Sequence, residues 1–259
     1  DHYATALVDA CEALNLDFEC FGLVPFVNDI SAITGDILHD KESLIIPFGS
    51  TKIIKLWLKN ELPQNWKVFY DSVGFDFLAQ IMYSKELSDK LLNVEKGFIL
   101  DFPECVDDKF KRDLFVKPTN DLKLFNGQVL PAGKSLRNLF DKQTTNSDIY
   151  ELREKVLFSS VKNIKEEYRC FVIGDKVHTC MYKYQGKVVK METDFITKMN
   201  LIEYCTLYNP AGGKDPYVVD VALVEESNNS LVYKILEYNA FQCSGFYNID
   251  AKQVLKHTV

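Results

Sequence analysis

The chain has 259 residues, of which 47% are hydrophobic, so it can bury a full core, and a disordered chain, a collagen or a small disulfide-stabilised protein is excluded. Its net charge of −7 disfavours a dedicated nucleic-acid or anionic-membrane binder, because both need a basic surface. The charge is uneven, however. Residues 109–169 carry 13 Lys or Arg and 8 Asp or Glu, a net +5, which leaves −12 for the rest of the chain. A basic region inside an acidic protein indicates a specific role.

The N-terminal third alternates short helical and extended patterns, which is typical of a small α/β domain. Asp1 can cap a helix whose apolar face includes Leu7 and Leu14, and Ser50 can cap a second helix through Leu58. We expect, in order, a helix over 1–14, an extended run over 18–27, a strand over 43–48, a helix over 51–58, a strand over 67–70 and a helical stretch ending at 82.

From about Leu114 the pattern changes to longer strands. We expect a strand over 114–118, a polar loop or hairpin over 119–134, a helix over 148–158, strands over 168–173 and 176–184, a helix over 191–208, and strands over 217–224 and 231–238. Gly174 and Asp175 form a turn between two of these strands, which predicts a hairpin.

Cysteine and histidine usage bears on compartment and metal binding. The seven cysteines are odd in number and include no Cys-x-x-Cys pair, which favours a reducing compartment. The four histidines show no zinc-site spacing. No segment reaches the roughly 20 apolar residues of a membrane span, and the first 20 residues do not resemble a signal peptide. We therefore expect a cytoplasmic protein without a membrane partner.

The last predicted hairpin carries the most informative acidic residues. If its turn is symmetric about residues 228 and 229, Asp220 lies opposite Glu237, with Cβ atoms about 5 Å apart. Glu237 and Asn239 share a strand face because they are two residues apart. Two carboxylates and an amide are oxygen ligands that suit Mg²⁺ together with nucleotide phosphates. An exposed hairpin with incidental acids is the alternative that spacing alone leaves open.

A complementary set of charges lies upstream. Glu167 and Arg169 share a face of their strand, Lys117 ends a strand before Pro118, and Lys123 lies in the following loop. Singly, each fits a solvated surface charge. Together with the acidic hairpin they fit a polyphosphate site, in which cations neutralise the phosphates and acids hold the metal.

Four stretches of the chain resemble the catalytic core of the ATP-grasp superfamily in order and approximate spacing. They are FVKP at 115–118, EYRCFVIGDKV at 167–177, VVDVALV at 218–224 and ILEYNAFQCSGFY at 235–247. The stretch YRCFVIGDKV is especially similar to glutamate-adding ligases. The arginine and the two lysines in the KPTNDLKLFNG context resemble a divergent phage and bacterial clade named for one arginine and two lysines. The resemblance covers residues 113–259.

This resemblance implies an α+β fold in which two lobes clasp ATP, after a small α/β N-terminal domain. The implied domains are 1–82, an N-terminal lobe over 83–157 and a C-terminal lobe over 158–259. The implied nucleotide contacts are Lys117 and Lys123 on the phosphates, Glu167 beside them, the hinge residues Ser159, Ser160 and Val161 at the adenine, and Arg169 on the transferring phosphoryl group. Arg169 and Lys123 are the implied catalytic residues.

The remaining implied roles concern metal and acceptor. Asp220, Glu237 and Asn239 would bind Mg²⁺ or Mn²⁺, with Glu237 bridging two ions, and Ser244, Gly245 and Tyr247 would contact the acceptor. The implied activity is an ADP-forming ligase that joins a carboxylate to an amine through an acyl phosphate, with a peptide or protein among the candidate substrates. The alternatives are an ATP-dependent kinase or ligase that modifies a nucleic-acid or protein acceptor, and a non-catalytic nucleotide-binding module.

Overall fold

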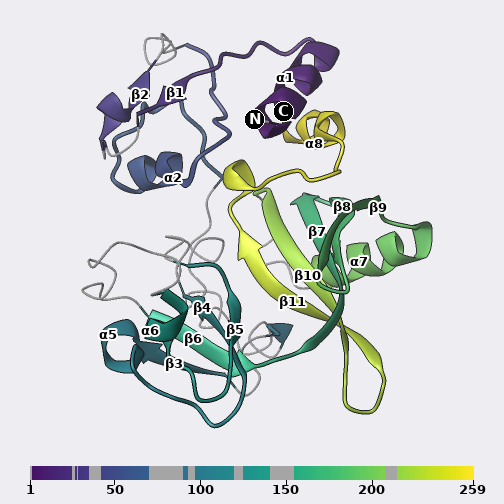
Figure 1. Ribbon diagram of the computed structural model, residues 1–259. Helices are drawn as coiled ribbons and strands as arrows, with labels where there is room; N and C mark the ends of the chain where they lie inside the picture. The colour runs from purple at the N-terminus through teal and green to yellow at the C-terminus, as the bar shows by residue number, and fades with distance from the viewer. Residues whose placement is uncertain are drawn as a thin grey trace.

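The protein, described by a computed structural model, is a mixed α+β molecule built around two antiparallel sheets (Figure 1). The structure describes residues 2–24, 27, 29–34, 42–69, 90–92, 97–119, 125–140, 155–207 and 215–259. A four-stranded sheet has the order β3-β6-β4-β5, and a five-stranded sheet has the order β11-β10-β7-β8-β9. A two-stranded sheet, β1 with β2, lies in the N-terminal part. No helix in the described part is long and apolar enough to cross a membrane.

The N-terminal part contains α1 (His2–Leu14), β1 (Gly22–Leu23), the short 3-10 helix η1 (Ile30–Ala32), β2 (Ile33–Thr34) and α2 (Thr51–Leu58). Both expected helices are confirmed, and the Ser50 side chain caps α2 by accepting a hydrogen bond from the Lys52 amide. Helix α1 packs against α8 (Ala251–Thr258) at the other end of the chain, so the two termini lie side by side (Figure 1).

The strand predicted over 43–48 is wrong, because only Ile45 pairs, through a parallel bridge to Trp66. Ile46 and Phe48 instead pack against the hydrophobic core that α1 and α8 share with the five-stranded sheet. The segment is therefore held by side-chain packing and not by pairing with a strand. The described residues of the predicted strand 67–70 also form no strand. The helix predicted to end at 82 lies outside the described residues.

The four-stranded sheet forms the middle of the chain. It contains β3 (Phe98–Asp101), β4 (Leu114–Pro118), β5 (Gln128–Leu130) and β6 (Lys155–Ser160), with α5 (Phe102–Cys105) and α6 (Leu136–Phe140) beside it. The strand predicted over 114–118 is confirmed, and β4 pairs with β5 in an antiparallel hairpin. The helix predicted over 148–158 is wrong from residue 155 onward, because 155–160 is the central strand β6, buried between β3 and β4. Residues 148–154 lie outside the described part.

The five-stranded sheet is formed by β7 (Asn163–Ile173), β8 (Lys176–Tyr184), β9 (Lys187–Glu192), β10 (Tyr217–Glu225) and β11 (Leu231–Asn239). The β7–β8 hairpin is confirmed, with Gly174 at φ +58° in its turn. The helix predicted over 191–208 starts later, since α7 is Phe195–Leu207, capped by Asp194 through the Thr197 amide, and 191–192 belong to β9. The 3-10 helix η5 (Phe241–Cys243) then leads to α8.

Strand β7 shows how the sheet separates core from site. Tyr168 and Val172 point to the face packed against α7, whereas Phe171 points to the opposite face, against the core of α1 and α8. Glu167 and Arg169 continue that second face beyond the apolar residues. Alternation along β7 therefore places Glu167 and Arg169 at the edge of the core that contains Phe171.

The last hairpin has the predicted pairing of Asp220 with Glu237, but it reaches this register by two irregularities. The turn pairs Glu225 with Leu231, one residue shorter than a turn symmetric about 228 and 229. A bulge at Leu236 then shifts the register by one residue and restores the pairing. Asp220 and Glu237 are paired because the bulge compensates for the shorter turn.

Candidate functional site

A cavity of about 860 Å³ lies between the two large sheets. Its lining includes Phe115 and Lys117 from β4, and Arg169, Asp220 and Glu237 from β7, β10 and β11. The chain crosses from one sheet to the other between β6 and β7, that is, between Ser160 and Asn163. The cavity therefore lies where a ligand can touch both sheets beside their connection.

At one lining position, Gly127, the backbone lies close to an aromatic ring. A Cβ atom at Gly127 would lie 2.7 Å from the Cζ atom of Phe115, well inside van der Waals contact. Gly127 and Phe115 both line the cavity. Glycine at 127 thus lets the Phe115 ring lie against the wall of the cavity.

Lys117 and Glu237 connect the two sheets directly. The Lys117 Nζ donates to the Glu237 Oε2 at 2.6 Å, and the lysine side chain is 14% exposed against 38% for the glutamate. Partial burial raises the pKa of Glu237, but the ammonium of Lys117, with help from Arg169 and Lys183, lowers it to below its ordinary value. Glu237 is thus held as a carboxylate.

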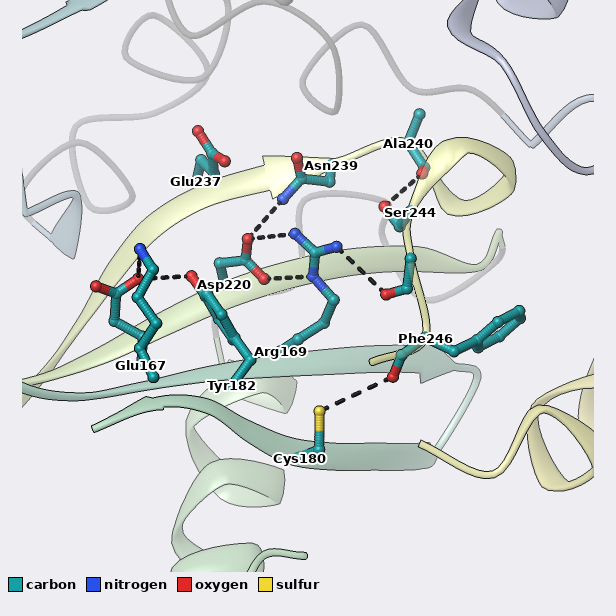
Figure 2. A network of polar contacts seen from close by, with 12 residues as sticks. Glu167, Arg169, Cys180, Tyr182, Asp220, Glu237, Asn239, Ala240, Ser244 and Phe246 are labelled. Carbon is teal, nitrogen blue, oxygen red and sulfur yellow. Dashed lines mark hydrogen bonds and ion pairs between the residues drawn. The ribbon is translucent and has the colours of Figure 1, made fainter. Parts of the chain in front are cut away.

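Arg169 and Asp220 form a buried, bidentate ion pair (Figure 2). The Arg169 Nε donates to Asp220 Oδ1 at 2.8 Å, and its Nη2 donates to Oδ2 at 2.7 Å. The Nη1 donates to the carbonyl of Gly245 at 3.3 Å, and the Asn239 amide donates to Asp220 Oδ2 at 3.2 Å. Burial raises the pKa of Asp220, and Arg169 opposes that shift without cancelling it. Both side chains are thereby fixed in orientation.

Glu167 is held by two neighbours on β8. The Tyr182 hydroxyl donates to Glu167 Oε2 at 2.8 Å, and the Lys183 Nζ donates to the same oxygen at 3.0 Å. Consecutive residues normally point to opposite faces of a strand, but a register shift between β7 and β8 lies at this position. The bulge directs both side chains to one carboxylate.

The segment after β11 closes one end of the site. The Ser244 hydroxyl is buried and donates to the carbonyl of Ala240 at 2.8 Å, which stabilises the bend after η5. Gly245 faces Arg169 with its carbonyl, and Tyr247 lines the cavity at 43% exposure. Of the three predicted acceptor residues, Tyr247 is the one with an exposed side chain.

Comparison with known proteins identifies this arrangement. The model of an ATP-grasp domain, family 2 of the clade named for one arginine and two lysines, matches residues 99–257, more than half of the chain. The chain belongs to the ATP-grasp family. The family match and the similarity to a solved structure confirm the expected α+β ATP-grasp fold. ATP-grasp domains bind ATP.

One solved structure with a TM-score above 0.5 agrees with this fold. The crystal structure of D-alanine-D-alanine ligase from Helicobacter pylori is similar over 96% of this chain and 79% of that chain, with a TM-score of 0.56 and 15% identity. The L-amino acid ligase from Bacillus licheniformis matches over 70% of this chain and 49% of that chain, with a TM-score of 0.45 and 10% identity. No match was found among curated protein sequences.

Most of the predicted ATP-grasp site residues come together in the cavity. Those that line it are Lys117, Ser160, Val161, Glu167, Arg169, Asp220, Glu237, Asn239, Ser244, Gly245 and Tyr247. Ser159 is fully buried in β6 and does not line it. Lys123 lies outside the described residues. Sequence reasoning missed Tyr182 and Lys183, because the bulge that aims both at Glu167 leaves no mark in the alternation of residues.

The donor atoms of this ATP-grasp site fit a divalent cation at Glu237 and Asn239. Glu237 Oε1 and Asn239 Oδ1 accept no hydrogen bond from the described residues. Asp220 already accepts three hydrogen bonds, so about one of its four acceptor positions remains. Among the described residues, no group of three or more His, Cys, Asp or Glu side chains converges as a metal site. A cation at this place would take protein oxygens from Glu237 and Asn239.

Proposed function

We propose that the protein is an ATP- and Mg²⁺-dependent ligase that joins a carboxylate to an amine through an acyl phosphate and releases ADP. The observation that carries the proposal is the contact of Lys117 with Glu237 across the two sheets, inside a cavity that also contains Arg169 and Asp220. Cations for a polyphosphate and oxygen ligands for a metal thus meet in one place.

The proposed reaction has two steps. A carboxylate oxygen attacks the γ-phosphorus of ATP, and the bond to the ADP oxygen breaks. An amine then attacks the acyl carbon, loses a proton, and phosphate leaves with the bonding electrons. Phosphorylation is needed because a carboxylate alone has no good leaving group. The protein contributes position and charge rather than covalent chemistry.

Individual residues account for this positioning. When the nucleotide binds, Lys117 leaves its contact with Glu237 and binds the phosphates instead. Glu237 can then hold the cation together with Asn239. Glu237 and Asn239 would hold Mg²⁺, which would supply positive charge to neutralise the phosphates. Arg169, fixed by Asp220, stabilises the charge on the transferring phosphoryl group. The link between β6 and β7 is the proposed hinge, and the proposed lobe boundary at 157/158 moves to residue 161, since β6 runs to Ser160.

The test is an assay for nucleotide products. With Mg-ATP, candidate carboxylates and hydroxylamine as the trapping amine, we expect ADP and a hydroxamate. AMP would instead indicate adenylyl transfer, and ADP without hydroxamate would indicate a kinase. Failure of the protein to bind an ATP analogue in the presence of Mg²⁺ would rule out both the ligase and the kinase.

The matched variant is Glu237→Gln. It removes the proposed cation ligand but keeps the size of the side chain, so we expect turnover to fall at least about 100-fold with little change in the unfolding midpoint. Glu226→Gln, in the turn of the same hairpin, is the control and should keep wild-type turnover. Full activity of Glu237→Gln would show that the metal assignment is wrong.

A further inference from the structure

Tyr247 has a backbone conformation that its side chain does not favour. Its φ is +53°, in the left-handed region. The other described non-glycine residues with positive φ are Asn15, Asn60, Gln185 and Asn229. Three of these four are asparagines, the residue type that tolerates this region best. A bulky aromatic residue there is strained, and it persists only when its surroundings hold it.

Burial does not explain this conformation, because 43% of Tyr247 is exposed. Its ring makes two specific contacts instead. It stacks on the ring of Tyr182, with centroids 5.0 Å apart and planes inclined by 7°. The Arg169 Cζ lies 4.7 Å from the Tyr247 centroid and 5.8 Å from the Tyr182 centroid. The strained residue is therefore engaged with the arginine of the site.

The two kinds of contact restrain different motions of Arg169. Hydrogen bonds to Asp220 and Gly245 fix the guanidinium within its plane and use three of its five N–H groups. The Tyr247 and Tyr182 rings pack against it and oppose tilting. The two other N–H groups meet no acceptor among the described residues. They belong to a group that lines the cavity.

We propose that Tyr247 is a positioning residue for Arg169. Its ring, stacked on Tyr182, holds the guanidinium so that the two remaining N–H groups meet the γ-phosphoryl group of the nucleotide. This inference rests on the proposed function for the identity of the ligand. It gives Tyr247 a role through Arg169, distinct from the acceptor contact that the sequence suggests.

The first experiment compares the affinities of Mg-ADP and of Mg-AMP-PNP, a non-hydrolysable ATP analogue, by equilibrium binding. Tyr247→Asn removes the ring but suits a positive φ, so the fold is kept. We expect the gain in affinity due to the γ-phosphate to fall about five- to tenfold, with Mg-ADP affinity unchanged. Tyr247→Phe keeps the ring and should restore the gain. Tyr184→Asn, at an equally exposed tyrosine of β8 (44%), is the matched control.

The second experiment needs no nucleotide. Hydrogen exchange of the Arg169 Nε–H, followed by NMR in the free protein, should be slow in the wild type and in Tyr247→Phe, and several-fold faster in Tyr247→Asn. Unchanged exchange in Tyr247→Asn would overturn the inference, as would an equal loss of affinity for both nucleotides. If the wild type binds neither nucleotide, the proposed function fails, while the exchange measurement still decides whether Tyr247 holds Arg169.

Discussion

At the scale of single residues, Lys117 is expected to matter more for nucleotide binding than for stability. Its ion pair with Glu237 is partly exposed, so Lys117→Met should lower the free energy of unfolding by less than about 1 kcal/mol. The same change removes a cation from the proposed phosphate site and should weaken Mg-AMP-PNP binding about tenfold or more. Equilibrium binding and urea unfolding measure the two effects.

The matched control for this lysine is Lys155→Met. Lys155 lies on the neighbouring strand β6, and its ion pair with Asp101 is half exposed and outside the cavity. This variant should bind Mg-AMP-PNP as the wild type does. Equal loss of binding in both variants would indicate a general charge effect instead of a contact at Lys117.

The Arg169–Asp220 pair, in contrast to Lys117, is expected to matter strongly for stability. Because both side chains are almost fully buried, Arg169→Met leaves the Asp220 carboxylate without its partner and should cost about 3–5 kcal/mol of unfolding free energy. The double variant Arg169→Met, Asp220→Leu removes both charges and should recover most of that loss. Urea unfolding of the two single variants and the double variant measures the coupling, and additive losses would contradict it.

At the scale of elements, the sequence predicts strands and faces well but not irregularities. Alternation places Glu167 and Arg169 on one face, and Asp220 pairs with Glu237 as expected, although the pairing depends on the bulge in β11 as well as on the turn. The bulges in β8 and β11 follow from tertiary packing, so the pairing of Tyr182 with Glu167 could not be predicted. Both bulges adjoin the site, where strands must aim side chains that simple alternation would turn away.

The errors in secondary structure share one cause. Residues 156–158 form a short apolar run in the centre of a sheet, and such a run does not distinguish a buried strand from a helix. The segment 43–48 has the pattern of a strand, but only Ile45 finds a partner. Whether an extended segment becomes a strand depends on neighbours distant in sequence, which local periodicity does not encode.

Two histidines between elements predict a pH dependence of stability. His178 on β8 stacks on His257 of α8, with Nε2 and Nδ1 3.0 Å apart. Burial, followed by the His257 charge and Lys198, lowers the pKa of His178 from 6.5 to about 4, while Asp250 opposes the shift. Between these values the unfolded chain binds a proton that the folded chain does not, so stability falls as pH drops from about 6.5 to 4.

The size of this effect is at most about 3.5 kcal/mol, since one pKa unit corresponds to about 1.4 kcal/mol. Urea unfolding across that pH range measures it. His178→Asn should flatten the curve between pH 6.5 and 4 compared with the wild type. An unchanged slope in this variant would assign the acid sensitivity to other groups.

At the scale of the whole molecule, the site depends on contacts between the two large sheets. Lys117 with Glu237 spans them, and residues 161–162 connect them along the chain. Helices α1 and α8 pack against each other and bring the two termini together (Figure 1), and neither helix lines the cavity. A ligand in the cavity therefore adds contacts between sheets without touching the helices that close the ends of the chain.

Nucleotide binding should accordingly slow hydrogen exchange in the two sheets more than in the rest of the chain. With Mg-AMP-PNP at about 100 times its dissociation constant, the free energy of unfolding should rise by about 2.7 kcal/mol. Hydrogen exchange measured by mass spectrometry should slow in segments 115–118, 160–164 and 236–239, which contribute to the cavity, and not in α1. Chelating Mg²⁺ with EDTA should reduce this protection, because Lys117 and Glu237 then stay paired and the phosphates lose their bridging cation. Protection confined to α1 and α8 would place the nucleotide elsewhere and contradict the two-sheet site.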